Sequence, residues 1–289
     1  DQGSLTMADG AVINAGSGMI DLDANEDITL GQLVTTNTTT TAVQITSVVG
    51  GIVDGGDTGG ADVISANGRT VIDAATGIGA ADPLETNVES IDADTTARAI
   101  DIDNSQASTT TVVSLTTVGD TVNFDQSGGG DLRITGSVTS GAVGTDGENI
   151  ELTSTSGLTV AGASTISSAV GTGGLLSINE ATIDSGAIIT VGAGDVTLNG
   201  SGQDTVINAA ITTATTATFT ATRDVIIGAT VATTNADADV IINANIDDDT
   251  AVGAGGVQIQ SAGQLVAGRN VTLTGSDLFV TNGAGILDS

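Results

Sequence analysis

The chain contains 289 residues, and its 35 acidic residues against five arginines give a formal net charge of -30. This charge argues against nucleic acid and anionic membranes as partners, because both are bound through a basic surface. The absence of His, Cys, Lys, Tyr and Trp excludes Ser–His and Cys–His nucleophile pairs, the usual zinc ligands, Schiff-base lysines and aromatic platforms for sugars or bases.

A short phrase recurs along the chain, in which a polar or Gly residue precedes an apolar–any–apolar run. In chain order its copies are 27–30, 62–64, 131–134, 149–152, 175–178, 195–198, 239–242, 256–259 and 270–273. A second apolar phrase follows most copies, at 157–160, 187–191, 204–208, 263–268 and 277–280. The period of two and the abundance of Val and Thr predict β-strands, with Gly, Asn and Asp in the turns. Each unit is therefore predicted to run strand, turn, strand, turn.

The spacing of this phrase predicts the length of one turn of the chain. Its first apolar residues are mostly about 14–25 residues apart in the later copies. These residues are Leu132, Ile150, Leu175, Val196, Val240, Val257 and Val271. The longer step from Val196 to Val240 predicts two turns, with the run 217–227 between them. Apolar residues at helical spacing form no long stripe anywhere in the chain, and segment 86–100 is the best, weak candidate for a helix.

These units predict an all-β fold, a parallel β-helix or β-solenoid of about 13–15 rungs, as a single domain over residues 1–289. A coil of about 20 residues buries only a few small side chains, which does not offset the entropy lost in ordering it. Stacking coil on coil closes the backbone hydrogen bonds and buries both sides of each core residue. A tandem of β-sandwiches is the alternative, disfavoured by the single Pro and the lack of Trp and Tyr.

The ends and the hydropathy of the chain give further expectations. No window holds 18 consecutive apolar residues, so no transmembrane helix is predicted. The chain starts at Asp1 without Met or a signal-peptide pattern, and we expect a mature form or a segment of a longer secreted protein.

Several stretches resemble a known family of large secreted bacterial proteins. They are 3–31, 45–68, 75–95 and 256–280, and the most distinctive phrase joins Gly-Ile-Gly at 77–79 to Pro-Leu-Glu-Thr at 83–86. The sequence resembles the filamentous-haemagglutinin-like surface proteins, which are abundant in marine bacteria and planctomycetes. The resemblance implies a right-handed β-helix and a segment of a long extracellular filament or adhesin. It covers most of the chain and carries no catalytic residue.

Acidic clusters are the candidate metal sites, with calcium as the candidate cofactor. Asp92 and Asp94, and likewise Asp101 and Asp103, have i, i+2 spacing, which places each pair on one face of a strand. Calcium takes six to eight oxygen ligands, and two rungs carrying such pairs could supply them. Three more candidates lie together at Asp247, Asp248 and Asp249. The stretches 59–68 and 200–209 also echo calcium-binding Gly-Asp repeats, although without their regular period. The alternative is a solvated acidic face.

A second hypothesis is carboxylate catalysis, as in β-helical lyases and hydrolases that cleave acidic polysaccharides. The candidate acids are Asp103 and Asp125, with Arg98 or Arg133 as the basic partner. The chain lacks the long, irregular loops rich in basic or aromatic residues that such a groove needs. We therefore expect no enzymatic activity.

Two Thr runs, 35–46 and 212–222, are interpreted as β-propensity residues or acceptors for O-linked glycans. The open strand edges of a solenoid favour end-to-end association with further copies into filaments. We therefore expect a secreted or cell-surface structural protein: a β-helical filament subunit, matrix component or adhesin stalk. The alternatives are a calcium-dependent adhesin that binds cell-surface or matrix glycans, and a polysaccharide-degrading enzyme.

Overall fold

The computed structural model describes residues 3–79, 81–141, 149–168, 176–179, 181–184, 186–192, 194–200, 204–244, 255–281 and 283–288. These residues form 31 β-strands and no helix, which confirms the predicted all-β fold. Segment 86–100 is not helical: most of it belongs to strand β9 (Leu84–Thr95), in which buried and half-buried residues alternate. Among the described residues there is no helix that is long and apolar enough to cross a membrane.

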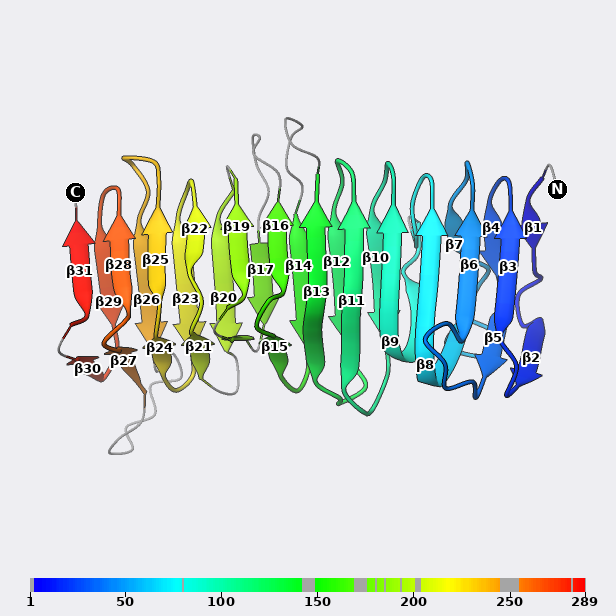
Figure 1. Cartoon of the computed structure of the whole chain (residues 1–289), viewed down its shortest axis with the longest axis horizontal. Coiled ribbons are helices and arrows are strands. Elements are labelled where there is room, and N and C mark those ends of the chain that lie inside the picture. Colours follow the sequence, from blue (N-terminus) through cyan, green and yellow to red (C-terminus); the bar gives the residue numbers. More distant parts are fainter. Residues whose placement is uncertain are drawn as a thin grey trace. The chain divides into compact units, whose positions relative to one another are not determined.

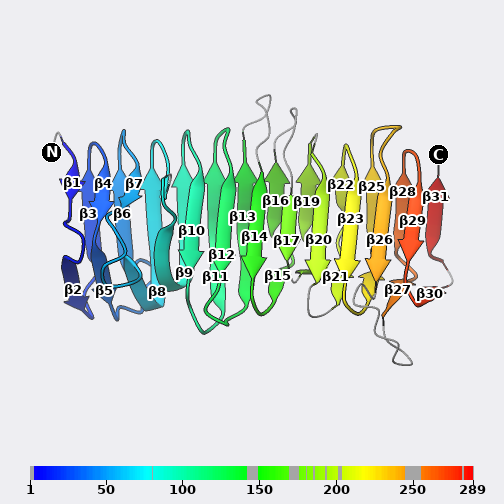
Figure 2. The ribbon, with the colours of Figure 1, turned by 180° about the vertical axis from the view of Figure 1, so that it is seen from behind.

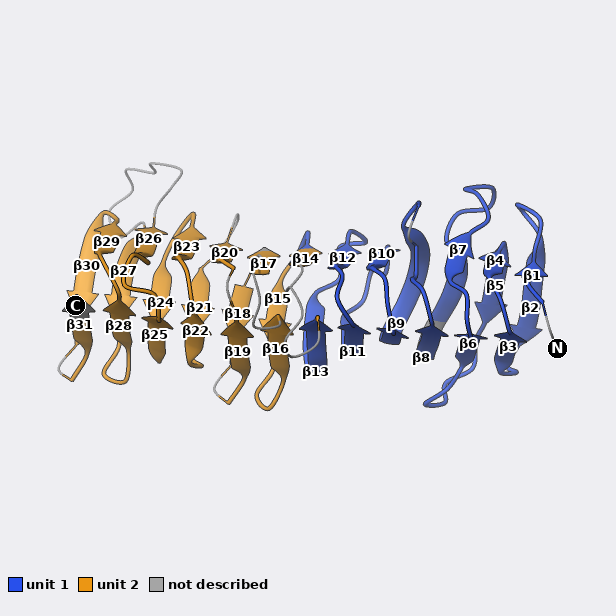
Figure 3. Ribbon diagram, turned by 90° about the horizontal axis from the view of Figure 1, so that it is seen from above, with its two compact units in different colours: residues 1–140, 154–156 blue, residues 141–153, 157–289 orange. Residues whose placement is uncertain are grey.

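The chain divides into two compact units, coloured separately in Figure 3: residues 1–140 with 154–156, and residues 141–153 with 157–289. Strands before residue 141 are β1 (Leu5–Thr6), β2 (Val12–Gly16), β3 (Ile20–Ala24), β4 (Ile28–Leu30), β5 (Gln32–Thr35), β6 (Val43–Ser47), β7 (Ile52–Asp54), β8 (Val63–Ala74), β9, β10 (Ile100–Asn104), β11 (Thr110–Thr117), β12 (Val122–Gln126) and β13 (Leu132–Ser140). The expectation of a single domain over 1–289 stays a prediction.

The described strands after residue 141 do not include any as long as β8 or β9. They are β14 (Ile150–Ser154), β15 (Leu158–Val160), β16 (Thr165–Ser168), β17 (Leu176–Asn179), β18 (Ala181–Ile183), β19 (Ile188–Val191), β20 (Val196–Gly200), β21 (Thr205–Ile207), β22 (Ile211–Thr213), β23 (Ala217–Ala221), β24 (Val225–Ile227), β25 (Thr230–Thr233), β26 (Val240–Ala244), β27 (Gly256–Ile259), β28 (Gln264–Ala267), β29 (Val271–Thr274), β30 (Asp277–Val280) and β31 (Gly285–Asp288). Figures 1 and 2 show the strands of each unit lying side by side.

Each turn of the coil contributes three strand segments, two of which are joined in long strands such as β8, β11 and β13. In the second unit the strands from β14 to β28 each pair in parallel with the third strand after them, as β17 does with β20 and β20 with β23. In the first unit β2 and β3 pair in the same way with β5 and β6. Strand β8 runs through a corner, so that its two halves pair with β5 and with β6. The chain is thus a parallel β-solenoid, as predicted.

The solenoid has about 11 turns, fewer than the 13–15 expected from the sequence. The strand–turn–strand–turn unit was wrong because a third strand completes each turn. Val257 belongs to β27, which stacks on Val225 of β24 and not on Val240, so the predicted series mixed two columns of strands. The two turns predicted between Val196 and Val240 are confirmed, because β23 pairs with β20 and with β26. Leu175 lies outside the described residues.

The core consists of aliphatic side chains stacked in register from turn to turn. In β20, β23 and β26 the buried residues Leu198, Phe219 and Ile242 lie opposite one another. Phe124 is also fully buried, whereas Phe279 of β30 is exposed. Burial of an aliphatic side chain stabilises a fold by about 1.5–3 kcal/mol. Because each core residue contacts the turns before and after it, the core exists only when turns are stacked.

A buried polar ladder replaces the aliphatic core at one corner of the first unit. Asn104 of β10 and Gln126 of β12 stack in register and are fully buried. The Asn104 Nδ2 donates to Gln126 Oε1 at 2.6 Å, and Asn104 Oδ1 accepts from the Val88 amide at 3.0 Å. Gln126 Nε2 in turn donates to the Gln106 carbonyl. These bonds satisfy amides that would otherwise be costly to bury.

Aspartates at the starts of strands join neighbouring turns. Each accepts a hydrogen bond at Oδ1 from the backbone amide at the equivalent position of the next turn. The pairs are Asp27 with Gly51 (2.8 Å), Asp195 with Thr216 (2.9 Å), Asp204 with Asp224 (3.1 Å), Asp224 with Gly256 (2.7 Å) and Asp239 with Asn270 (3.2 Å). Such charge-assisted bonds are stronger than neutral ones. Asp27, Asp195 and Asp239 open copies of the recurring phrase, so the opening polar residue has a structural role in these copies.

The corners bring successive turns so close that one of them requires glycine. A Cβ built on Gly136 in β13 would lie 1.9 Å from the carbonyl oxygen of Val113 in β11. No side chain fits there, and the two strands shift register at this place. Gly136 thus permits the bend that lets β13 continue into a second column of strands.

We expect Gly136→Ala to lower the stability of the protein by about 1–3 kcal/mol, because the added methyl group separates the backbones of two turns. The measurement is urea unfolding followed by circular dichroism. Gly3→Ala is the matched control, since a Cβ at Gly3 meets no atom within 4 Å. Equal unfolding midpoints for the two variants would contradict this account of the corner.

Candidate functional site

Asp92 and Asp94 point outward from β9, on one face as predicted. Their register partners on the previous turn are Val71 and Asp73 of β8, so Asp73 and Asp94 lie directly opposite each other. Burial, followed by the charges of Asp94 and Asp92, raises the pKa of Asp73 above 3.8. Burial and Asp94 likewise raise the pKa of Asp92, against the opposing effect of Arg69. The Arg69 Nη1 lies 3.4 Å from Asp92 Oδ2.

Asp101 and Asp103 point outward from β10 and belong to another column of strands. Asp103 stacks in register on Glu85 of β9 and on Asp125 of β12. The pKa of Asp103 is raised by burial and then by the charges of Asp125, Asp101 and Asp82. Burial also raises the pKa of Asp101, although a hydrogen bond from Asn123 opposes it.

The two predicted calcium pairs are therefore not brought together as two neighbouring rungs of one face. Asp92 and Asp94 stack between β8 and β11, whereas Asp101 and Asp103 stack on β12. They are consecutive strands of the coil, separated by a corner, because one turn contains three strands. The remaining candidates, Asp247, Asp248 and Asp249, lie outside the described residues.

The residues of the catalytic hypothesis are only partly brought together. Asp103 and Asp125 are register neighbours on adjacent turns. Arg98 is exposed in the turn that follows β9, and Arg133 is exposed in β13, which pairs with β11. Neither arginine forms an ion pair with Asp103 within the described part of the chain.

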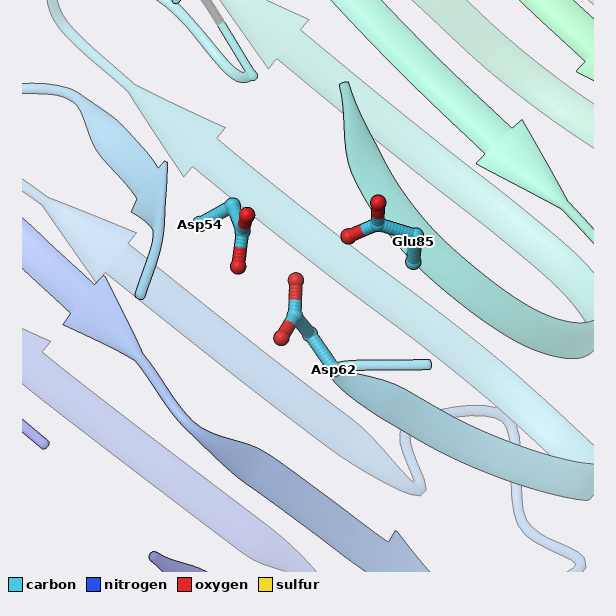
Figure 4. A group of neighbouring side chains, drawn as sticks. All are labelled: Asp54, Asp62 and Glu85. Carbon is cyan, nitrogen blue, oxygen red and sulfur yellow. The ribbon is translucent and has the colours of Figure 1, made fainter. Parts of the chain in front are cut away.

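A different acidic cluster lies on the first unit. Asp54 at the end of β7, Asp62 just before β8 and Glu85 in β9 each place a carboxylate oxygen within 4.8 Å of the others. Figure 4 shows the three carboxyl groups converging on one another. A second triad shares Asp54 and adds the exposed residues Asp57 and Asp82. We call Asp54, Asp62 and Glu85 the acidic triad.

Backbone contacts fix the positions of the acidic triad. The Asp62 amide donates to the Glu85 carbonyl at 2.8 Å, and the Asp62 carbonyl accepts from the Leu33 amide at 2.7 Å. Asp54 Oδ1 accepts from the Gly56 amide at 2.7 Å, which holds this carboxylate at the start of the loop 55–61. The backbone of Asp62 is therefore hydrogen-bonded to the turn before it and to the turn after it. The loop 55–61 brings Asp62 close to Asp54.

The electrostatics of the acidic triad are unfavourable. Burial, followed by the charges of Asp54 and Glu85, raises the pKa of Asp62 to about 8. Burial also raises the pKa of Glu85, and Asp54, Asp57 and Asp82 add to this effect. The Asp62 side chain is 1 % exposed, and its Oδ2 accepts no hydrogen bond from any described residue. No described arginine forms an ion pair with the triad.

The sequence analysis missed this triad. Asp62 opens a copy of the recurring phrase, and the stretch 59–68 echoes a calcium-binding repeat. Of the three residues, that stretch indicated only Asp62 as a possible metal ligand. Glu85 lies on the next turn, and only the register of β8 on β9 places it beside Asp62.

A groove of about 470 Å³ lies on the same unit. Its lining is mostly hydroxylated: Thr38, Thr39, Thr40, Asn67, Gly68, Arg69, Glu89, Ser90, Thr109, Thr111, Val113 and Thr135. The first Thr run thus contributes to its wall together with one guanidinium and one carboxylate. This lining can donate and accept hydrogen bonds from a hydroxylated ligand.

Comparisons of the chain with protein-family profiles, with curated proteins and with solved structures find no match.

We expect the thermal stability to rise as the pH falls from about 8 toward 3.8, because the pKa of Asp62 is raised to about 8 and those of Asp73, Asp92, Asp101 and Asp103 are raised above 3.8. The folded protein then binds more protons than the unfolded chain, so this contribution is complete below pH 3.8 and is lost as the pH rises through the folded pKa values. Melting curves at constant ionic strength measure it.

We expect Asp73→Asn to raise stability near pH 7.5 by about 0.2–1 kcal/mol and to reduce this pH dependence, because Asp94 then faces a neutral amide. Asp21→Asn is the matched control: Asp21 points outward from β3 and stacks on Gln44, which carries no charge. A stability that is flat with pH, or an equal effect of both variants, would contradict the assignment to stacked carboxylates.

Proposed function

We propose that this chain is part of an extracellular structural protein, in which the β-solenoid serves as a filament subunit, matrix component or adhesin stalk. The observation that carries the proposal is the in-register ladder, with its aliphatic columns inside and its aspartate clamps between turns. Such a ladder extends by adding turns, because each new turn repeats the contacts of the one before it. The resemblance to filamentous-haemagglutinin-like surface proteins supports the same role.

The charge supports a location outside the cell or on its surface. With a net charge of -30, the chain repels itself, and surrounding cations screen this repulsion. Extracellular fluids supply sodium and calcium at high concentration. The fold gains its stability from repetition and not from disulfides, as the absence of Cys requires.

End-to-end association is part of the proposal. In the second unit β30 pairs with β27, and β31 pairs with β28. Leu278, Phe279 and Val280 of β30 are about half exposed, and Ile286 of β31 is similarly uncovered. In the proposed assembly a further coil, of this protein or of another copy, covers these side chains and continues the ladder.

A calcium-dependent adhesin is the second candidate function. The hydroxyl-rich groove that contains Arg69 and Glu89 favours it, because hydroxyl, guanidinium and carboxylate groups are suitable partners for the hydroxyl groups of glycans. In this candidate the solenoid positions the groove, and glycans of a cell surface or matrix are the partners.

We expect electron microscopy of the purified chain to show fibres with a regular axial repeat, more abundant at high salt because screening reduces repulsion between copies. Phe279→Asp should abolish the fibres by placing a charge in the covered surface. Val48→Asp is the matched control, since Val48 is also an exposed apolar residue but lies in the first unit. Monomers at every salt concentration, or fibres of Phe279→Asp, would contradict end-to-end assembly through β30.

A further inference from the structure

We propose that Asp54, Asp62 and Glu85 bind one calcium ion, which ties the loop 55–61 to the next turn of the solenoid. The three residues come from the end of β7, the start of β8 and the first part of β9. The sites expected from the sequence, at Asp92 with Asp94 and at Asp101 with Asp103, are different ones. The inference goes beyond the filament role and does not depend on it.

The geometry of the triad suits a single ion. Calcium binds oxygen at about 2.3–2.6 Å, so two oxygens on one ion lie no more than about 5 Å apart. The three carboxylates meet this limit, since each has an oxygen within 4.8 Å of the other two. Asp57 and Asp82, which form the second triad with Asp54, place two further carboxylates at the exposed side.

The strongest observation is the second oxygen of Asp62. Like the aspartates that clamp neighbouring turns, Asp62 comes directly before a strand. At three of those aspartates Oδ2 also has a partner, which is Arg223 for Asp204, Arg269 for Asp239 and Gln258 for Asp224. Asp62 Oδ2 is buried and has no partner.

The side chains that face Asp62 are carboxylates. At Asp204 and Asp239 the facing group is a guanidinium, and at Asp224 it is an amide. Asp54 and Glu85 both oppose its negative charge, and burial removes the water that would screen it. Three converging carboxylates at a buried position are costly to ionise together, and a bound cation between them removes this cost. The position that an arginine fills in the second unit is therefore assigned to a metal ion at Asp62.

Calcium is the cation that fits these ligands. All of them are hard oxygen donors, which favour calcium or magnesium over transition metals, and the chain has no His or Cys to bind a softer ion. Magnesium requires a near-ideal octahedron of short bonds, whereas calcium accepts irregular sets of carboxylates. The loop between Asp54 and Asp62 contains four glycines, and Gly56, Gly59 and Gly60 have positive φ, so it supplies an irregular set.

The test compares the whole chain with Asp62→Asn, which keeps the shape of the side chain and removes its charge. The probe is CaCl2, titrated in a calorimeter at constant ionic strength. Wild-type protein is expected to bind calcium with a saturable heat, and Asp62→Asn to lose it. Glu85→Gln, at a half-buried position, should lose it as well and serves if Asp62→Asn does not fold.

Asp94→Asn is the matched control, because Asp94 is also an outward carboxylate opposite another acid, Asp73, and its loss changes the net charge equally. Diffuse attraction of calcium to the acidic chain would be equal in Asp94→Asn and Asp62→Asn. A saturable heat retained in Asp94→Asn and lost in Asp62→Asn therefore supports the triad.

Melting curves give a second readout that separates binding from folding. Without calcium, Asp62→Asn should melt above the wild type, because the variant removes repulsion within the triad. With calcium, the wild type should gain melting temperature and the variant should not. Three results would overturn the proposal: no saturable calcium binding by the wild type, equal binding by Asp62→Asn, or an equal response to magnesium.

Discussion

Each turn of this protein depends on its two neighbours for backbone hydrogen bonds, because the described strands pair in parallel with strands of other turns. A parallel pair cannot be closed by a tight hairpin, so the partner of each strand lies one full turn of the coil away in the sequence. Stability is therefore a property of stacked turns and not of a single one. The small aliphatic core, the glycine corner at Gly136 and the buried amide ladder at Asn104 all serve this close stacking.

In-register stacking places residues of one kind on top of each other, and for charged residues this is both useful and costly. Asp195 and Asp239 use their carboxylates to hold the amide of the next turn. Asp73 and Asp94 repel each other, and burial together with the charge of Asp94 raises the pKa of Asp73. The acidic triad is the extreme case, since Asp62 is buried among like charges. The same acid-rich composition thus contributes clamps, repulsive columns and the proposed cation site.

The sequence predicted the fold class because its strongest signal is local. A period of two with β-branched residues indicates strands, and a recurring phrase indicates stacking. The step from Val196 to Val240 even located two turns correctly, since β23 fills the interval. The number of strands in a turn could not be predicted from short sequence patterns. Val257 and Val240 open similar phrases, yet they belong to different columns, and only the pairing of β27 with β24 separates them.

The candidate site was harder to predict for the same reason. The i, i+2 spacing correctly placed Asp92 with Asp94 on one face of β9, because alternation belongs to the strand itself. Which acids meet across turns depends on register and on the corners. By itself, the sequence determined a cysteine-free, strongly acidic chain of short strands that must stack to fold. Only the tertiary structure decided that three strands make a turn and that Asp54, Asp62 and Glu85 converge, because long-range register is set by packing around a complete turn.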